Sequence, residues 1–305
     1  MNINESMLNE MVEDFKNGIN LTQKYGNDPE TIEIAYELQS GSYTEVAKRD
    51  AEIHEKFFSE VANHINSFSD LSQISTLLEV GVGEGTSLLG ISEKLDFQGE
   101  FIGVDMSYSR LSWCKDNFRK ANTPINLAVA YASSLPFHDK SLDIVLTVHS
   151  LEPNGDQEEL LLGELARISR KYLILVEPDF GKANSMQKER MASLGYIGDL
   201  RKFFKDLPFE LIVDASMQNN RHLVDGIPVN SASIFILKRK DVPSEIGDPS
   251  FCSPAGQAFL QNFKHGLISS TGLFFPILDE IPFLRPTDAL YCLSPKFDTK
   301  SMKRT

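Results

Sequence analysis

Apolar residues follow two different spacings along this chain, and the two spacings alternate. Short apolar runs, which predict buried strands, cover residues 77–80, 101–105, 125–130, 141–148, 171–176, 209–215 and 231–238. Between them, apolar residues at three- and four-residue steps predict amphipathic helices over residues 87–91, 107–122, 157–168 and 184–207. Strands that alternate with helices predict an α/β fold whose parallel sheet is covered by helices on both faces.

The two ends of the chain differ from this alternating middle. The N-terminal end contains three helical runs, at residues 7–15, 29–38 and 46–68. Asp28 and Pro29 are suited to be the N-cap and the first residue of the second run. From Asp241 onward the chain is richer in proline and glycine and ends in a charged tail. We therefore predict three parts: a helical cap at 1–70, a central domain at 71–240 and a small α+β or β accessory domain at 241–305.

Three glycines follow the first predicted strand at every second position. Glu79 ends the strand, and Gly81, Gly83 and Gly85 lead into a helix. Glycine permits positive φ, and main-chain N–H groups at a helix N-terminus bind a flat or anionic ligand. The loop lacks a Gly-Lys-Ser/Thr sequence and has G-x-G-x-G spacing, which disfavours the known phosphate and dinucleotide loops. Glu79 would repel a phosphate, whereas it could accept a hydrogen bond from an amino group.

The second predicted strand also ends in an acid, Asp105, where a carboxylate would bind both hydroxyls of a ribose. With this acid and the glycine loop, the chain resembles the class I S-adenosylmethionine-dependent methyltransferases. Their first motif resembles Leu78–Gly85, and their ribose-binding acid resembles Asp105. The resemblance implies a Rossmann-like, seven-stranded, mostly parallel sheet with an antiparallel final pair. It also implies S-adenosylmethionine as cofactor, S-adenosylhomocysteine as product, and these cofactor-binding residues: Glu79, Gly81, Gly83, Gly85, Asp105 and Met106.

The loop after the third predicted strand resembles the segment with which this family contacts adenine. Leu135-Pro136-Phe137 matches the family pattern. Tyr131 stands where the family has an aspartate that binds the adenine amino group. The backbone of Ala132 or the hydroxyl of Ser133 is therefore the better candidate for that contact.

The loop after the fourth predicted strand carries the candidate catalytic residues His149, Glu152 and Asn154. Methyl transfer is an in-line displacement that depends mainly on positioning, but an oxygen or nitrogen acceptor can still need a base. His149 faces the cofactor and substrate or, alternatively, bonds the loop backbone. Glu152 and Asn154 orient the acceptor or cap the next helix, for which Asp156 is another candidate. Because carboxyl ends of parallel strands meet at one edge, five residues are expected to surround one crevice: Glu79, Asp105, Ala132, His149 and Glu177.

Composition limits the partners and the compartment. The chain has 30 basic and 43 acidic residues, a net charge of −13, so a basic footprint for nucleic acid is missing. Its three cysteines, Cys114, Cys252 and Cys292, are widely separated, which indicates a reducing compartment. The first residues do not have the basic segment followed by an apolar segment that is typical of a signal peptide. The sequence also has no run of 18 apolar residues, the length that a membrane-spanning helix needs. We expect a soluble cytoplasmic protein that binds neither nucleic acid nor membrane.

The C-terminal region resembles the small zinc-ribbon module of the Trm112-like family. The resemblance rests on residues 251–255 and 272–284, the second of which contains Phe-Pro-Ile and Ile-Pro-Phe-Leu. Of the metal-binding cysteines only Cys252 remains, and Ala255 marks a lost position. A structural zinc ion needs about four thiolate or imidazole ligands, and Cys252, His265 and Cys292 lack paired spacing. We predict a metal-free module, stabilised by its apolar residues and docked on the central domain.

The sequence therefore predicts a methyltransferase that transfers a methyl group to an oxygen or nitrogen atom of a small molecule. A non-catalytic or activator-type binding module that retains the fold is the alternative, because the degenerate ribbon resembles a methyltransferase partner. A dinucleotide-dependent oxidoreductase would require nicotinamide binding, which the glycine spacing disfavours. The acceptor and the oligomeric state, a homodimer included, are left open.

Overall fold

A seven-stranded sheet forms the centre of the protein in the computed structural model, which describes residues 3–26, 28–68, 70–221, 223–224, 227–241, 247–254 and 256–292. The strand order is β3-β2-β1-β4-β5-β9-β6, and β9 alone among these seven runs antiparallel to its neighbours. The predicted mostly parallel sheet with an antiparallel final pair is thus confirmed. The strands are β1 (Thr76–Val80), β2 (Glu100–Asp105), β3 (Asn126–Val129), β4 (Leu142–Val148), β5 (Ser169–Pro178), β6 (Phe209–Ser216) and β9 (Ala232–Arg239).

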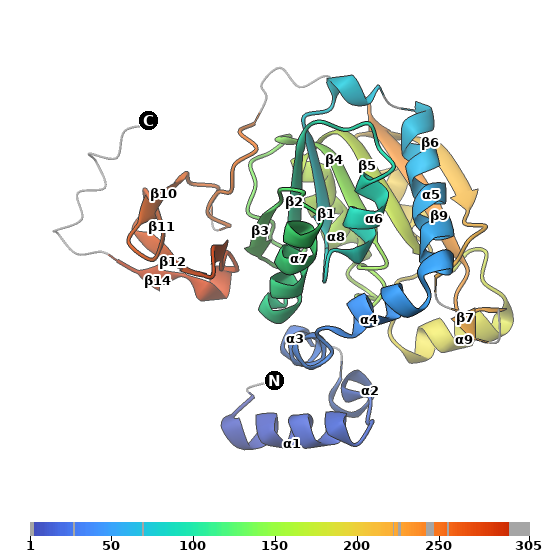
Figure 1. Ribbon diagram of the computed structural model, residues 1–305, viewed down its shortest axis with the longest axis horizontal. Helices are drawn as coiled ribbons and strands as arrows, with labels where there is room; N and C mark the ends of the chain where they lie inside the picture. The colour runs from blue at the N-terminus through green and yellow to red at the C-terminus, as the bar shows by residue number, and fades with distance from the viewer. Residues whose placement is uncertain are drawn as a thin grey trace.

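Helices cover both faces of this sheet, as predicted, and each face has its own apolar core (Figure 1). One core contains residues of α5 (Ala51–Phe68), α6 (Thr86–Ser92) and α7 (Tyr108–Lys120). The other contains residues of α8 (Glu158–Ile168) and α10 (Arg201–Phe204). The central strands β1 and β4 are buried on both sides, as continuous apolar runs require.

Two predicted helices are each divided in the structure. Residues 184–207 form α9 (Ser185–Ser193) and the short α10, because Gly195 adopts a positive φ of 64° after the first of them. Residues 46–68 belong to α4 (Ser42–Arg49) and α5, and Asp50 leaves the helical conformation between them. In both places the apolar spacing continues across the break, so spacing alone did not reveal it.

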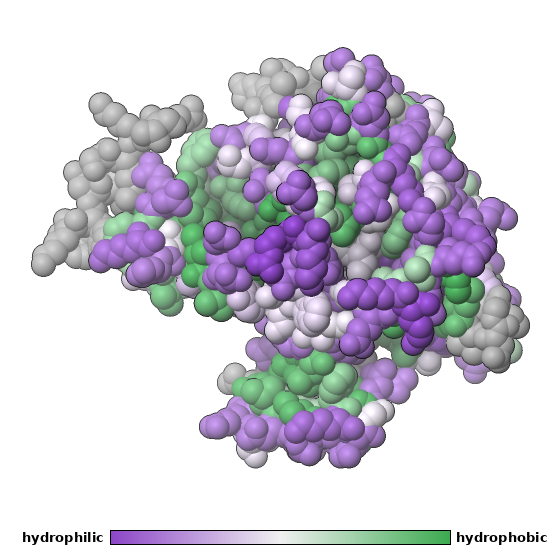
Figure 2. Space-filling view, viewed as in Figure 1, coloured by the Kyte–Doolittle hydropathy of each residue, from purple (hydrophilic) through white to green (hydrophobic). Residues whose placement is uncertain are grey.

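The N-terminal helices lie beneath α4 and α7 in Figure 1. They are α1 (Glu5–Lys16), α2 (Leu21–Tyr25) and α3 (Pro29–Leu38). A short 3-10 helix, η1 (Leu71–Gln73), comes later in the chain, between α5 and β1. Asp28 caps α3 and Pro29 begins it, as the sequence predicts. The first three helices bury a small core of their own around Met11, Leu21 and Ala35. In Figure 2 the outer side of this group is hydrophilic, and its apolar side faces the rest of the protein.

An antiparallel sheet near the C-terminus packs beside β3 (Figure 1). Its connection to the central sheet is direct, because Phe283 forms a parallel bridge with Val129 and the Leu284 N–H donates to the Val129 carbonyl over 2.8 Å. The elements of this region are β10 (Leu260–Phe263), β11 (Gly266–Ser269), β12 (Leu273–Leu278), β13 (Ile281–Pro282), η2 (Pro286–Asp288) and β14 (Leu290–Tyr291). A small hairpin earlier in the chain consists of β7 (Leu223–Val224) and β8 (Ile227–Pro228).

Cys252 is buried in this C-terminal region, and its backbone N–H donates to the Pro136 carbonyl over 2.8 Å. Among the described residues, no group of three or more His, Cys, Asp or Glu side chains is arranged to hold a metal ion. Ala255 and the charged tail at 300–305 lie outside the described residues. Within the described part of the chain, no helix is both long enough and apolar enough to cross a bilayer.

Candidate functional site

A cavity of about 420 Å³ opens at the carboxyl ends of β1, β2 and β4, a size typical of small-molecule sites. The predicted site residues that line it are Glu79, Gly81, Asp105, Met106, Ala132, Ser133, His149 and Asn154. The predicted residues that do not are Gly83, Gly85, Glu152 and Glu177. The tertiary fold therefore gathers four of the five predicted strand ends, and Glu177 is the exception.

The glycine loop needs positive φ at all three glycines, as expected from their spacing. A Cβ on Gly81 would lie 2.3 Å from the Ser150 Cβ, so the loop after β4 packs directly on the glycine loop. Gly83 does not face the cavity; its N–H donates to Asp105 Oδ2 over 2.9 Å. This bond ties the glycine loop to the acid at the end of β2.

Asp105 is buried and holds the turn after β2, because its Oδ1 accepts from the Ser107 N–H over 2.9 Å. Ser107 in turn caps α7 by accepting from the Arg110 N–H. A carboxylate has about four acceptor positions, so two remain beyond the bonds to Gly83 and Ser107. Asp105 therefore stabilises the turn and can still accept hydrogen bonds from a ligand in the cavity.

Glu79 is almost completely buried at the end of β1. Burial raises the pKa of Glu79 to about 8, although the nearby Arg221 guanidinium opposes this shift. Its Oε2 lacks a hydrogen-bond partner in the part of the chain that the structure describes. A buried, unsatisfied oxygen is costly unless a ligand supplies a donor. The cavity wall thus offers an acceptor suited to an amino group.

Two arginines that line the cavity were not found from the sequence. Arg221 donates to Ser87 Oγ and to the Val148 carbonyl, and its guanidinium lies 5.3 Å from the Phe57 ring centre. Arg110 lies in a buried position on α7. Neither belongs to a local motif, and Arg221 is far along the chain from the glycine loop, so no signal in the sequence indicates it.

Arg110 lies against two tyrosines from the N-terminal helices. Its guanidinium carbon is 4.8 Å from the ring centre of Tyr36 and 4.4 Å from that of Tyr43, distances typical of cation–π contacts. Both rings line the cavity. Tyr43, which comes from the N-terminal helices, therefore reaches the site. The N-terminal helices therefore form one wall of the cavity.

His149 occupies an unusual backbone position in the loop after β4, with a φ of 53°. Its Nδ1 lies 3.4 Å from Glu152 Oε2. Burial and the charge of Arg221 hold the pKa of His149 well below its usual value. Burial raises the pKa of Glu152 to about 7, against the opposing charges of Arg221 and Arg190. Near neutral pH, His149 is therefore uncharged and Glu152 is close to its midpoint.

Glu177 does not face the crevice; its carboxylate binds the backbone of the loop after β4. Its Oε1 accepts from the N–H groups of Ser150 and Leu151, over 3.2 and 3.3 Å. Burial raises the pKa of Glu177 to about 8, and the nearby Glu152 adds to the shift. The expectation that Glu177 contributes to the crevice wall is therefore wrong.

Asn154 does not cap the following helix, which was one of its two interpretations. Its amide donates to the Leu151 carbonyl over 3.2 Å, and the N-cap of α8 is Gln157 without a side-chain bond. Asp156, the other candidate cap, is likewise not the N-cap. Asn154 thus tightens its own loop while it lines the cavity.

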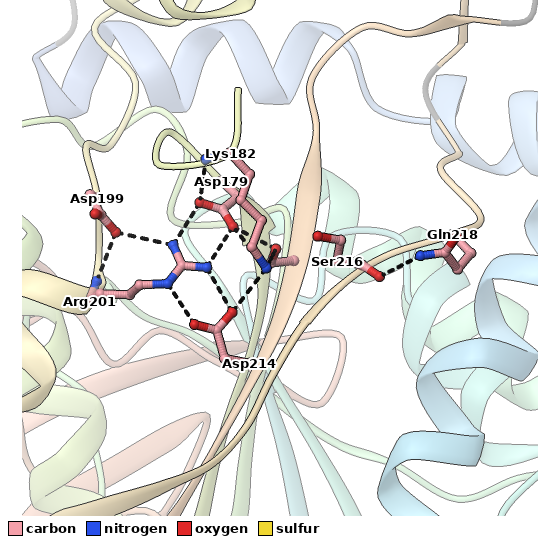
Figure 3. A network of polar contacts seen from close by, with 8 residues as sticks. Asp179, Lys182, Asp199, Arg201, Asp214, Ser216 and Gln218 are labelled. Carbon is pink, nitrogen blue, oxygen red and sulfur yellow. Dashed lines mark hydrogen bonds and ion pairs between the residues drawn. The ribbon is translucent and has the colours of Figure 1, made fainter. Parts of the chain in front are cut away.

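Asp179, which directly follows β5, is buried in a polar network (Figure 3). Arg201 donates to both of its oxygens over 2.8 Å, and Ser233 Oγ donates to Oδ2 over 2.6 Å. Burial alone would raise the pKa of Asp179, but the bonds from Arg201 and Ser233 outweigh it and lower the pKa to about 2. Arg201 also binds Asp214 on β6. The network joins β5, β6 and β9, and it is structural.

A second cavity, of about 250 Å³, adjoins the first one. The two share Tyr43, His149 and Arg221 in their walls. The remaining lining residues of the second cavity are Glu152, Arg190, Tyr196, Asn220, Val229 and Asn230. Glu152 therefore lies on the side of His149 that faces this second space.

Comparison with known proteins identifies the fold. A family model described as a methyltransferase domain matches residues 77–171, which include the glycine loop, Asp105 and His149. Magnesium protoporphyrin IX methyltransferase from Synechocystis PCC 6803, solved with bound SAH, is similar with a TM-score of 0.54 at 13% identity, over 70% of this chain and 100% of that one. Geranyl diphosphate C-methyltransferase from Streptomyces coelicolor A3(2) has a TM-score of 0.48 at 15% identity, over 59% and 80%. The protein has the class I methyltransferase fold, and residues 77–171 match the model of a methyltransferase domain.

Proposed function

We propose that this protein is an S-adenosylmethionine-dependent methyltransferase that acts on an oxygen or nitrogen atom of a small molecule. The observation that carries the proposal is Asp105, buried at the end of β2 in the wall of the 420 Å³ cavity, with acceptor capacity left after its bonds to Gly83 and Ser107. A carboxylate in this position is suited to the two hydroxyls of a ribose. The match of residues 77–171 to a methyltransferase domain supports the same conclusion.

The residues of the cavity fit the cofactor at both of its polar ends. The unsatisfied Oε2 of Glu79 would accept from the amino group of the methionine part. Ala132 and Ser133, which line the cavity after β3, are suited to the adenine. When bound, the cofactor supplies an electrophilic methyl group on a sulfonium. The chain itself binds and orients the reactants, excludes water, and offers the Glu152 carboxylate for the acceptor's proton.

We also propose that all three parts of the chain contribute residues to the cofactor cavity. The helices of residues 1–70 supply Tyr36 and Tyr43, and residues 71–240 supply the strand ends. The region of 241–305 contributes Thr287 to the same cavity wall. Its function is then to limit access to the cofactor without supplying chemistry. A cytoplasmic location is consistent with this proposal.

Calorimetric titration with S-adenosylhomocysteine tests the proposal. Asp105→Ala should weaken binding at least tenfold, because each lost charge-assisted hydrogen bond contributes roughly 1.5–3 kcal/mol. The matched control is Asp116→Ala on α7, whose side chain is 45% exposed and pairs with Arg119. Equal affinity in the Asp105 variant and the parent would remove this residue from the site. Binding without any transfer of methyl label would favour the non-catalytic alternative.

A further inference from the structure

The 250 Å³ cavity is a separate space with its own polar groups, and it opens beside the proposed cofactor site. Its shared wall consists of Tyr43, His149 and Arg221. A methyl acceptor must reach the reactive methyl group from a space next to the cofactor, because in-line displacement needs the two reactants in contact. The cavity therefore has the position that an acceptor site requires.

The lining of this cavity has more positively charged groups than negatively charged ones. Among its described lining residues are two guanidinium groups, Arg190 and Arg221, and one carboxylate, Glu152. Arginine stays protonated inside proteins, so one carboxylate cannot neutralise both. Arg221 is buried and Arg190 is half-buried. A cation that is shielded from water is unfavourable unless it is paired, so an anion would be a stabilising occupant of this space.

Arg190 is the arginine placed to bind such an anion. It extends from α9, donates through Nη1 to Asn230 Oδ1 over 3.0 Å, and lies 5.7 Å from the ring centre of Tyr196. These contacts fix the direction of the guanidinium. A guanidinium has five N–H donors in a planar fork, which matches the two oxygens of a carboxylate. Arg221, in contrast, is committed to Ser87 and Val148 at the border of the two cavities.

The same cavity also has the groups suited to the reacting part of the acceptor. Glu152 and His149 face the same cavity, and their side chains are 3.4 Å apart. Tyr43 and Tyr196 line this cavity as well and supply aromatic surface. The cavity thus combines guanidinium groups, aromatic surface and a carboxylate that can accept a proton.

We propose that this cavity binds the methyl acceptor and that the acceptor is a small molecule with a carboxylate, which Arg190 holds, and a separate hydroxyl or amine beside Glu152. This inference rests on the proposed methyltransferase function. The acceptor's oxygen or nitrogen bonds to the methyl carbon while the carbon–sulfur bond breaks and its electron pair stays on sulfur. The acceptor's proton passes to the Glu152 carboxylate. The product keeps its own carboxylate and therefore its negative charge.

The experiment uses the full chain, methyl-labelled S-adenosylmethionine and a small-molecule cell extract that an anion exchanger has divided into retained and unretained fractions. We expect label to enter the retained fraction. Arg190→Gln should raise the KM for that fraction roughly tenfold to hundredfold, the range expected for hydrogen bonds to a charged group. Arg190→Lys should recover part of the loss, since it keeps the charge but not the fork.

Two controls separate this inference from the proposed function. S-Adenosylhomocysteine should bind Arg190→Gln as tightly as the parent, and circular dichroism should show the same fold. Arg119→Gln removes an arginine whose side chain is 71% exposed on α7, and it should change neither KM nor affinity. Label in the unretained fraction, or an unchanged KM in Arg190→Gln, would overturn the inference while the methyltransferase function stands. A parent protein that does not bind S-adenosylhomocysteine would overturn both.

Discussion

Thr44 donates both its backbone N–H and its hydroxyl to one carboxylate oxygen of Glu84, over 2.6 and 2.5 Å. The other oxygen of Glu84 accepts from the N–H groups of Gly41 and Tyr43, over 2.9 and 3.2 Å. An acid inside the glycine loop thus caps the N-terminus of α4, where a negative charge is favoured. This contact attaches the N-terminal helices to the cavity wall and places Tyr43 beside Arg110.

Replacing Glu84 by glutamine tests this attachment. The amide keeps one acceptor oxygen but presents an NH₂ group to the other donors, so we expect the free energy of unfolding to fall by about 1.5–3 kcal/mol. Amide hydrogen exchange of α4 should become faster. Affinity for S-adenosylhomocysteine should fall as well, since Tyr36 and Tyr43 line the cavity. Glu45→Gln, an exposed change in the first turn of α4, is the control and should have little effect. Unchanged exchange of α4 in Glu84→Gln would contradict the capping role.

Gly83→Ala should be destabilising. Gly83 has a φ of 53°, which costs an L-residue roughly 1–2 kcal/mol, and a Cβ there would lie 2.7 Å from Arg110 Nη2. Arg110 would have to move away from Tyr36 and Tyr43, so the melting temperature should fall. Gly163→Ala is the matched control: this exposed glycine within α8 has nothing within 4 Å of the added Cβ. It should stabilise the protein by about 0.5–1 kcal/mol. Urea unfolding of both variants measures the difference, and equal effects would disprove the argument.

Asp179→Asn should destabilise the protein in a way that depends on pH. The pKa of Asp179 is lowered from 3.8 to about 2 in the folded state, which corresponds to about 2 kcal/mol of stability. Because the folded pKa is the lower one, this stability is present above pH 4 and is lost as the pH falls toward 2. The parent and Asp179→Asn should therefore differ most near neutral pH and converge in acid. Asp206→Asn, an exposed change nearby, should match the parent throughout. A difference that stays constant from pH 7 to pH 2 would exclude the charge of Asp179 as its cause.

Methyl transfer to the anionic fraction of a cell extract should become faster as the pH rises through about 7. Burial raises the pKa of Glu152 to this value, and a carboxylate accepts a proton only when ionised. His149 stays neutral over this range because its pKa is held well below 6.5, so its titration does not change the rate in this range. Glu152→Gln should lower the rate about a hundredfold and abolish the rise. Glu159→Gln, exposed in the first turn of α8, should preserve the parent profile. A rise near pH 7 that persists in Glu152→Gln would assign the proton to another group.

The order of strands and helices could be predicted from the sequence because it depends on local apolar spacing, which a buried sheet imposes on every strand. The positive φ of Gly81 and Gly83 and the capping of α3 by Asp28 are local in the same sense. Helix ends were less predictable. The breaks at Asp50 and Gly195 interrupt the backbone without interrupting the apolar spacing, and only the packing of the finished fold shows them.

For the site, the sequence by itself determined which residues end the parallel strands, and the structure brings Glu79, Asp105, Ala132 and His149 into one cavity because parallel strands share an edge. Only the tertiary structure decided that Glu177 supports a loop beneath that edge. It also decided which residues complete the walls: Tyr36, Tyr43, Arg110, Arg190 and Arg221. These side chains come from separate helices and loops, and what joins them is burial, charge and contact between distant segments. Such long-range contacts leave no regular spacing along the chain. The sequence therefore predicts the residues at the strand ends, and only the fold shows which residues from other segments complete the cavity.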